Sequence, residues 1–302
     1  MSNRILLFSQ SPHEGFLKLY EGILKAVFRK FRKTVIFSRL PYVSVQEKKA
    51  YRIVKEEIER CDGILGACGD LSEECASAVL EASKPYAKFH CCGRKAVISP
   101  VMGAEEKKED GCVYAVKSLE YKNAENTVKA MIKSLKRKDA TVVTDSGESP
   151  VNKMISSIAE EICLKTADIK LQKMSMEEIM WQCKNIESFP DVFITGENER
   201  AATAFMCSLR PSLGGYIRYE GEKKSLYTAE KLPFSEITGS AALSAAMACA
   251  AMLENELEMQ SAAEWLRRAA AISWEKCENP GEEAFLNEII THINEKMRNR
   301  KN

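Results

Sequence analysis

Histidine is scarce in this sequence of 302 residues, where only His13, His90 and His292 occur. Because imidazole is the side chain most often used for proton transfer near neutral pH, this scarcity restricts histidine-based catalysis to very few positions. Charge of one sign is not in excess either, since 44 Lys and Arg residues face 43 Asp and Glu residues, for a net charge of +1. A protein that coats nucleic acid needs a basic excess to neutralise phosphates, so we expect no nucleic-acid partner.

Long apolar runs are also missing. The longest mostly apolar stretch, residues 241–253, spans 13 residues and is too short to cross a bilayer. The opening residues MSNRILLFSQ lack the length and the cleavage site of a secretory signal. None of the 11 cysteines has C-x-x-C spacing, which argues against a zinc knuckle and a thioredoxin-type motif. We therefore expect a cytoplasmic protein without a membrane partner, whose thiols are reduced and mostly packed as small core residues.

Strand-like and helix-like patterns alternate along most of the chain. Short apolar runs indicate strands, and apolar residues recurring every three or four positions indicate helices. The predicted strands are residues 4–8, 34–38, 62–69, 140–144, 169–172 and 191–195, and the predicted helices are residues 16–31, 46–61, 125–138, 151–165, 176–184, 241–258, 262–274 and 282–297. This alternation predicts βαβ units and an α/β fold with a mostly parallel sheet.

Three motifs then give a family resemblance. They are DVFITG at 191–196, CSLRPSLGG at 207–215, and LSAAM at 243–247 with ML at 252–253. Together they resemble the isocitrate/isopropylmalate dehydrogenase family, which has a DVxVTxN strand, a PGSLG turn and an LSAAMML helix. Further pieces at 62–69, 86–89, 107–114 and 141–145 resemble family segments in the same order. No G-x-G-x-x-G or P-loop motif offers another nucleotide-binding interpretation.

The resemblance implies a two-domain isocitrate/isopropylmalate dehydrogenase-like fold, with a mostly parallel sheet flanked by helices in each domain. The first α/β domain is then discontinuous and combines residues 1–88 with residues 212–302, and the second spans residues 89–211. The family is dimeric and holds its subunits together with a strand clasp, which is shortened here at residues 115–122. We therefore expect a homodimer, or a heteromer with a related dehydrogenase subunit.

The family oxidises a 2-hydroxy acid with NAD or NADP and removes the neighbouring carboxylate as carbon dioxide. The resemblance places its general-acid tyrosine at Tyr114, which an ordinary strand-end tyrosine would equally explain. Its catalytic lysine position holds Ser146, whose hydroxyl has no comparable basicity. Two metal-binding aspartate positions hold Ala201 and Phe205, and a third falls on residue 176 or on Glu177.

Substrate-binding and cofactor positions differ as well. The arginine of the family's YANVRP segment corresponds to His90 and that of its RExTxGxY segment to Lys107, while Lys84 and Arg94 are nearby cations that are either substitutes or ordinary exposed charges. The family's HGSAPD cofactor loop falls near residues 224–229, which contain no histidine. The resemblance thus implies NAD or NADP, but no residue can be assigned to a cofactor.

Acidic residues elsewhere are candidates for a rebuilt metal site. They are Glu197 and Glu199, together with Asp70, Asp145 and Glu177. A solvated loop explains the ENER segment at 197–200 equally simply, so we expect no divalent metal. His13 lies in the first strand-to-helix loop, where open α/β sheets commonly bind ligands.

Two functional hypotheses follow. In the first, the chain is a divergent dehydrogenase-like protein that cannot perform metal-dependent oxidative decarboxylation, and it acts as a metabolite-binding or partner subunit. In the second, it is an active NAD(P)-dependent 2-hydroxy-acid dehydrogenase with a rebuilt site. The first is favoured because metal, base, substrate and cofactor elements all differ together.

Overall fold

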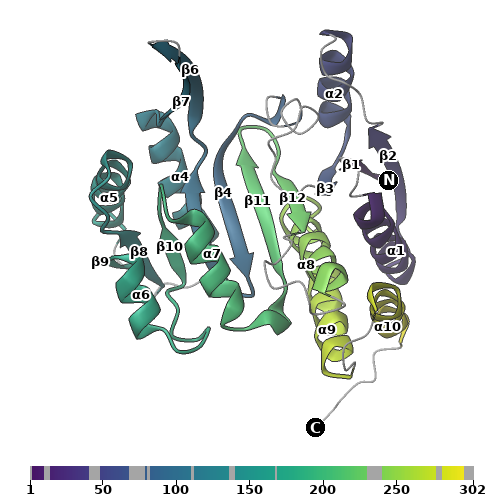
Figure 1. Ribbon diagram of the computed structural model, residues 1–302. Helices are drawn as coiled ribbons and strands as arrows, with labels where there is room; N and C mark the ends of the chain where they lie inside the picture. The colour runs from purple at the N-terminus through teal and green to yellow at the C-terminus, as the bar shows by residue number, and fades with distance from the viewer. Residues whose placement is uncertain are drawn as a thin grey trace. The chain divides into compact units, whose positions relative to one another are not determined.

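The computed structural model of the chain describes residues 2–9, 14–40, 48–67, 79, 82–109, 112–135, 140–166, 169–229, 240–276 and 281–295. The chain forms two compact units. Unit 1 comprises Met1–Lys84, Ser212–Arg218 and Lys223–Asn302, and unit 2 comprises Pro85–Pro211 and Tyr219–Glu222. In each unit, strands of a sheet are flanked by helices, which confirms the expected α/β class (Figure 1). No described helix combines the length and apolarity that crossing a membrane requires.

Unit 1 contains a parallel set of strands. Their order is β2 (Thr34–Leu40), β1 (Ser2–Ser9), β3 (Gly63–Ala67) and β12 (Leu226–Ala229). The apolar run from Ile5 to Phe8 is fully buried on both faces of β1, as expected for a parallel strand covered on each side. The crossovers between these strands contain α1 (Glu14–Lys30) and α2 (Lys48–Arg60).

The helical core of unit 1 is built around α8 (Ser240–Asn255). This helix is apolar nearly all round and buries a run of small side chains, because it packs against α1, α9 (Gln260–Lys276), α10 (Glu282–Asn294) and β12. The buried Tyr20 hydroxyl of α1 donates a hydrogen bond to Gly66 O and accepts one from Ala229 N, each at 2.8 Å. Tyr20 therefore links the helix to β3 and β12.

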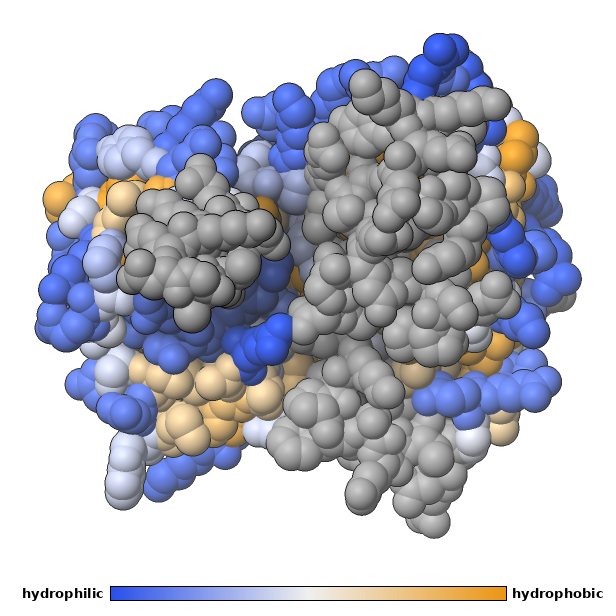
Figure 2. Space-filling view, turned by 45° about the horizontal axis from the view of Figure 1, so that its top comes forward, coloured by the Kyte–Doolittle hydropathy of each residue, from blue (hydrophilic) through white to orange (hydrophobic). Residues whose placement is uncertain are grey.

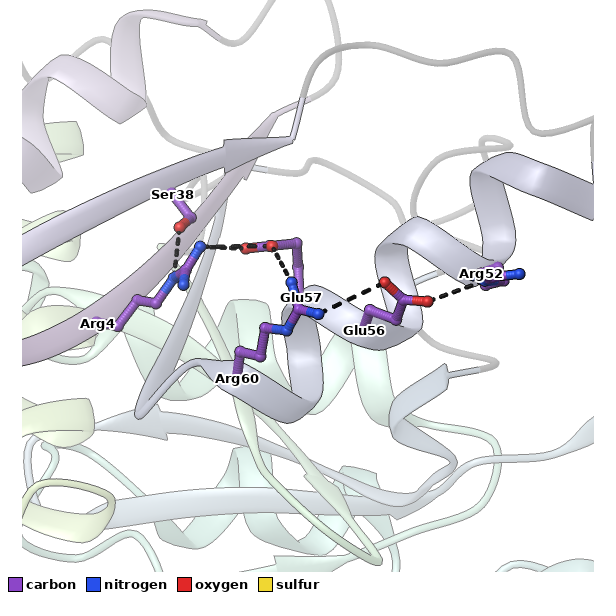
Figure 3. A network of polar contacts seen from close by, with 6 residues as sticks. All are labelled: Arg4, Ser38, Arg52, Glu56, Glu57 and Arg60. Carbon is purple, nitrogen blue, oxygen red and sulfur yellow. Dashed lines mark hydrogen bonds and ion pairs between the residues drawn. The ribbon is translucent and has the colours of Figure 1, made fainter.

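Arg4 connects β1 of unit 1 to its neighbours at the surface. Its Nε donates to the Ser38 hydroxyl at 2.8 Å, and its Nη2 lies 3.0 Å from the Glu57 carboxylate of α2. Arg60 and Glu56 extend this network along α2 toward solvent, as Figure 3 shows.

The sheet of unit 2 contains both antiparallel and parallel strand pairs. The antiparallel pair β4 (Pro85–Cys92) and β5 (Lys95–Pro100) is followed by the parallel strands β10 (Val192–Ile194), β8 (Thr141–Asp145) and β9 (Lys170–Met174). On one face, α4 (Tyr121–Ser134) and α5 (Pro150–Cys163) bury Phe89 and Ile98 in a common apolar core. Helix α7 (Glu199–Ser208) packs against β5 and β4, and the short helix α6 (Met176–Gln182) follows β9.

A second, two-stranded sheet consists of β6 (Gly103–Glu109) and β7 (Cys112–Ser118). In this antiparallel hairpin Lys107 lies opposite Tyr114. Among the described strands, β6 and β7 pair only with each other. The hairpin overlaps the segment expected to form a shortened clasp, and its pairing with another subunit stays a prediction.

Some helix ends differ from the sequence-based prediction. The helix predicted at residues 241–258 ends at Asn255, because Glu258 adopts a left-handed backbone conformation (φ 53°) that turns the chain before α9. The helix predicted at residues 125–138 already begins at Tyr121. The predicted burial of most cysteines is confirmed for Cys61, Cys92, Cys163, Cys183, Cys207 and Cys249.

Candidate functional site: polar side chains around Glu199 in unit 2

A group of polar side chains lies on the face of β4 and β5 that α7 covers. Lys88 and His90 are two positions apart on β4, so their side chains point to the same face. Ser99 of β5 lies directly opposite Lys88 in the antiparallel pairing, which puts its side chain on that face too. Glu199, the first residue of α7, projects toward all three.

The Glu199 carboxylate uses both oxygens. Its Oε1 lies 2.7 Å from His90 Nε2 and 3.3 Å from Lys88 Nζ, and its Oε2 accepts a hydrogen bond of 2.5 Å from the Ser99 hydroxyl. An ionised carboxylate carries no proton, so His90 Nε2–H is the donor of the shortest nitrogen contact. The side chain of His90 is only 8% exposed and Ser99 is 1% exposed, whereas Glu199 is 20% exposed.

The surroundings keep Glu199 ionised. Burial by itself raises the pKa of the carboxyl, but the hydrogen bond from His90, the Lys88 charge and the hydrogen bond from Ser99 outweigh it and hold the pKa well below its ordinary range. The position of Glu199 in the first turn of α7 adds to this, since the amino end of a helix favours negative charge. Glu199 therefore acts as a permanent anion at neutral pH and not as a proton donor.

Lys88 is held from a second side. Its ammonium group lies 5.8 Å from the centre of the Tyr219 ring, in addition to its contact with Glu199. Tyr219 is itself buried. The arrangement thus presents one hydroxyl and two nitrogen donors to a carboxylate. That carboxylate is the side chain of Glu199.

A second polar group lies where β8 and β10 end. Asp145 Oδ2 accepts hydrogen bonds from Thr195 Oγ1 at 2.7 Å and from Asn198 Nδ2 at 2.8 Å, and its Oδ1 accepts one from Gly147 N at 3.0 Å. Asn152 of α5 accepts a further bond from Gly196 N at 2.8 Å. These contacts fix the two loops to each other, so the Asp145 carboxylate is already engaged in holding the backbone.

The structure brings together two of the residues singled out from the sequence, His90 and Glu199. Lys84 is the last residue of the first segment of unit 1 and adopts a left-handed backbone (φ 48°), while Arg94 is exposed in the turn between β4 and β5. Neither joins the cluster.

The remaining candidates lie elsewhere. Ser146 and Glu197 are exposed in the loops after β8 and β10, and Glu177 is exposed in the first turn of α6. Tyr114 and Lys107 face each other along the β6–β7 backbone, but their side chains lie outside the described part. His13 and Asp70 lie outside the described residues altogether.

The two positions at which the resemblance led us to expect metal-binding aspartates do not fit a metal. Both lie on α7, where Ala201 has no donor atom and the ring of Phe205 packs 6.4 Å from that of Phe189. Divalent cations such as Mg²⁺ and Mn²⁺ need oxygen ligands, which neither residue supplies. Within the described ranges, no three His, Cys, Asp or Glu side chains are grouped so that they could hold a metal ion.

The segment at which the resemblance led us to expect a cofactor loop, residues 224–229, does not fit a nucleotide either. Residues 226–229 form β12 and are buried in the sheet of unit 1, and Lys224 donates to the backbone oxygen of Cys61. These contacts hold the segment as a core strand, where a cofactor loop would need exposed backbone and side-chain donors.

Sequence reasoning missed Lys88 and Ser99. A signal was present for Lys88, because it shares a strand face with His90 through their spacing of two. Ser99 had no such signal, since its partner across the sheet depends on the pairing of β4 with β5.

The fold resembles two solved structures, one of which is a dehydrogenase. A β-decarboxylating dehydrogenase from Thermococcus kodakarensis matches with a TM-score of 0.72 and 13% identity over 96% of both chains. The TT0538 protein from Thermus thermophilus matches with a TM-score of 0.71 and 11% identity over 98% of this chain and 69% of that chain. No protein-family model and no curated protein matches the sequence. At these identities the likeness defines the class as a dehydrogenase-like fold and goes no further.

Proposed function

We propose that this chain is a divergent isocitrate/isopropylmalate dehydrogenase-like protein that does not perform metal-dependent oxidative decarboxylation, and that it acts as a metabolite-binding or partner subunit. The fold likeness supports the dehydrogenase-like part of this proposal. The residues at the corresponding positions support the loss of this chemistry.

The observation that carries the proposal is the lack of oxygen ligands at Ala201 and Phe205 of α7. In a decarboxylating dehydrogenase the metal polarises the carbonyl that forms as the substrate is oxidised, and aspartates hold it. Here Ala201 and Phe205 occupy those positions, and Phe205 is in contact with Phe189. Restoring a cation at this place would require both new oxygen ligands and separation of the two rings.

The Glu199 cluster supports the same proposal. A substrate carboxylate needs cationic donors that are open to it. His90, which corresponds to a substrate-binding arginine, and its neighbour Lys88 are both paired with Glu199. A substrate would have to displace this internal carboxylate before it could bind these donors.

The position of the catalytic lysine gives a third argument. Ser146 is exposed, and its backbone N–H donates to Met174 O at 3.1 Å. A serine hydroxyl becomes a useful base or nucleophile only beside a group that accepts its proton. Tyr114 keeps the general-acid position, but a proton donor alone does not drive the oxidation.

The alternative is an active NAD(P)-dependent 2-hydroxy-acid dehydrogenase with a rebuilt site. The retention of Tyr114 favours it. It requires a cofactor site among residues other than 224–229 and a base other than a lysine at position 146.

For partners, we propose a homodimer, with a heteromer with a related dehydrogenase subunit as the other form. Large exposed apolar side chains of unit 2 support it: Trp181 and Leu164 are each 85% exposed, and Met180 is 52% exposed. Among the residues that Figure 2 colours, hydrophilic ones predominate and apolar ones gather in limited areas. We expect Trp181→Glu to convert the dimer to monomers in sedimentation velocity, and a monomeric wild type would contradict the homodimer.

The catalytic part is tested with the purified full chain. NAD and NADP are titrated with and without Mn²⁺ while the unfolding temperature is followed, and reduced-cofactor formation is then screened with malate-type 2-hydroxy acids. We expect neither stabilisation by the cofactor with the metal nor turnover. An active dehydrogenase assayed in parallel controls for the reagents.

Cofactor-dependent stabilisation together with turnover would overturn the proposal in favour of the active enzyme. In that case Tyr114→Phe is expected to reduce turnover strongly, because a general acid contributes roughly 100-fold or more to the rate. Turnover that Tyr114→Phe leaves unchanged would point to a chemistry different from that of the family.

A further inference from the structure

Three donors in unit 2 converge on a single carboxylate. His90 Nε2, Lys88 Nζ and Ser99 Oγ all lie within 3.3 Å of the Glu199 oxygens. The donors come from β4 and β5, whereas the acceptor comes from α7. The three donors are therefore positioned by the paired strands β4 and β5, and Glu199 on α7 is not part of that pairing.

We propose that Lys88, His90 and Ser99 form a binding site for a small organic carboxylate, and that the chain fills this site with the side chain of its own Glu199. The inference goes beyond the proposed function, and it holds whether or not the chain is catalytic.

Because the site is largely buried, its donors need an acceptor other than water. His90 and Ser99 are nearly inaccessible to water, so their donors depend on a protein or ligand acceptor. Tyr219 holds Lys88 at the same place through its ring. If the Glu199 carboxylate is removed, two buried donors and an ammonium group face a space that favours an anion.

The size of the space left by a truncated Glu199 follows from the atoms that the substitution removes. Truncating Glu199 to alanine leaves Cβ in place and removes Cγ and the carboxylate. Acetate has the same two-carbon skeleton as the removed atoms, so it can return both oxygens to the three donors. Acetamide has nearly the same shape but no charge, and it separates filling of the space from binding of an anion.

The experiment uses the full chain with Glu199→Ala. Acetate is titrated at constant ionic strength while the unfolding temperature is measured, with sodium chloride and acetamide as parallel titrants. We expect acetate at several times its dissociation constant to raise the unfolding temperature of the variant by about 2–4 °C. Chloride and acetamide are expected to have much smaller effects, and acetate is expected to leave the wild type unchanged.

Two matched variants sharpen the result. Glu197→Ala removes an exposed carboxylate two residues away, so we expect this variant to be insensitive to acetate. Glu199→Gln keeps the space filled, and we expect no response to acetate there either. Adding Ser99→Ala to Glu199→Ala removes one donor and is expected to weaken acetate binding about tenfold.

A spectroscopic readout, measured on Glu199→Ser as well as on Glu199→Ala, provides a second test if Glu199→Ala is poorly folded. The chain has three histidines, so the imidazole region of a ¹⁵N-correlated spectrum is simple, and His90→Asn assigns the signal of interest. Acetate is expected to shift the His90 signal alone in the variant. Glu199→Ser, which leaves a similar space with a polar residue at the helix start, is the second variant for this measurement.

The proposal is overturned if acetate neither stabilises Glu199→Ala or Glu199→Ser nor shifts the His90 signal, or if the wild type responds as strongly as the variants. Acetamide as effective as acetate would also overturn it, because the site would then bind by shape alone. These outcomes are independent of the cofactor and turnover assays, so failure here is distinguishable from failure of the proposed function.

Discussion

Two carboxylates with almost the same exposure behave differently in the two units. The Glu57 side chain of unit 1 is 19% exposed and that of Glu199 in unit 2 is 20% exposed. Glu57 pairs with Arg4, which is 39% exposed, and more loosely with Arg60, which is 60% exposed and 3.8 Å away (Figure 3). Glu199 instead pairs with His90 and Ser99, which are nearly buried.

We infer from this difference that the contribution of such a network to the free energy of unfolding depends more on the burial of the partners than on that of the carboxylate. The Arg4 and Arg60 guanidinium groups can turn to water when Glu57 is removed, and exposed ion pairs contribute little for this reason. His90 and Ser99 are buried, so removal of Glu199 takes an acceptor away from donors that water reaches poorly. The Glu57 network ties α2 to β1, and the Glu199 network holds a charge inside unit 2.

The largest effect is expected for Glu199→Ala. Loss of the carboxylate takes the shared acceptor away from Lys88, His90 and Ser99, and we expect the free energy of unfolding to fall by about 2–4 kcal/mol. Urea denaturation followed by circular dichroism measures it. Glu57→Ala is the matched variant of unit 1, and an equal loss in both would break the comparison.

The next effect concerns pH. The pKa of Glu199 is lowered in the folded state, so its contribution to stability is present above the ordinary pKa of 4.5 and is lost as pH falls from there toward the folded-state value. Between about pH 6 and pH 3 we expect the wild type to lose more stability than Glu199→Gln, which has no charge to lose. Parallel stability curves for the two proteins would contradict this assignment.

A smaller effect is expected for Ser99→Ala. The hydroxyl donates one charge-assisted hydrogen bond of 2.5 Å to Glu199 Oε2, while His90 and Lys88 still hold Oε1. We expect a loss of about 1–2 kcal/mol in the free energy of unfolding. In the Glu199→Gln background the same substitution is expected to cost much less, and an undiminished cost there would show that Ser99 acts through another partner.

The smallest effect is expected for Glu57→Gln. The Arg4–Glu57 pair lies near the surface, so we expect a loss of about 0.2–1 kcal/mol that shrinks further in high salt. Chemical denaturation at low and high ionic strength measures both quantities. If salt does not reduce the loss, Glu57 resembles Glu199 in being shielded from solvent, and the contrast between the two networks is removed.

Much of the fold could be predicted from the sequence. Apolar runs such as that at β1 and the helical period of α1 are local signals, and both elements occur where they were predicted. The strands of the β4–β5 hairpin were missed because their side chains are mixed in polarity, although Gly93 in the turn, with φ 61°, was an available hairpin signal.

The candidate site could be predicted only in part. His90 and Glu199 were each singled out, but they are 109 positions apart in the chain, and their contact depends on α7 packing against β4 and β5. Ser99 joins them through strand pairing, which no local pattern encodes. Glu199 was considered as a metal ligand, whereas its oxygens are engaged by the chain's own donors.

A double-mutant cycle of Glu199 and His90 tests the central claim most directly, which is that Glu199 occupies a carboxylate site built by the sheet of unit 2. The free energy of unfolding is measured for the wild type, Glu199→Ala, His90→Ala and the double variant, with Glu57 and Arg4 as the reference cycle. The account predicts a coupling energy of about 1.5 kcal/mol or more for Glu199 and His90, and well under about 1 kcal/mol for the reference pair. Coupling energies that are equal in the two cycles, or near zero for Glu199 and His90, would contradict it.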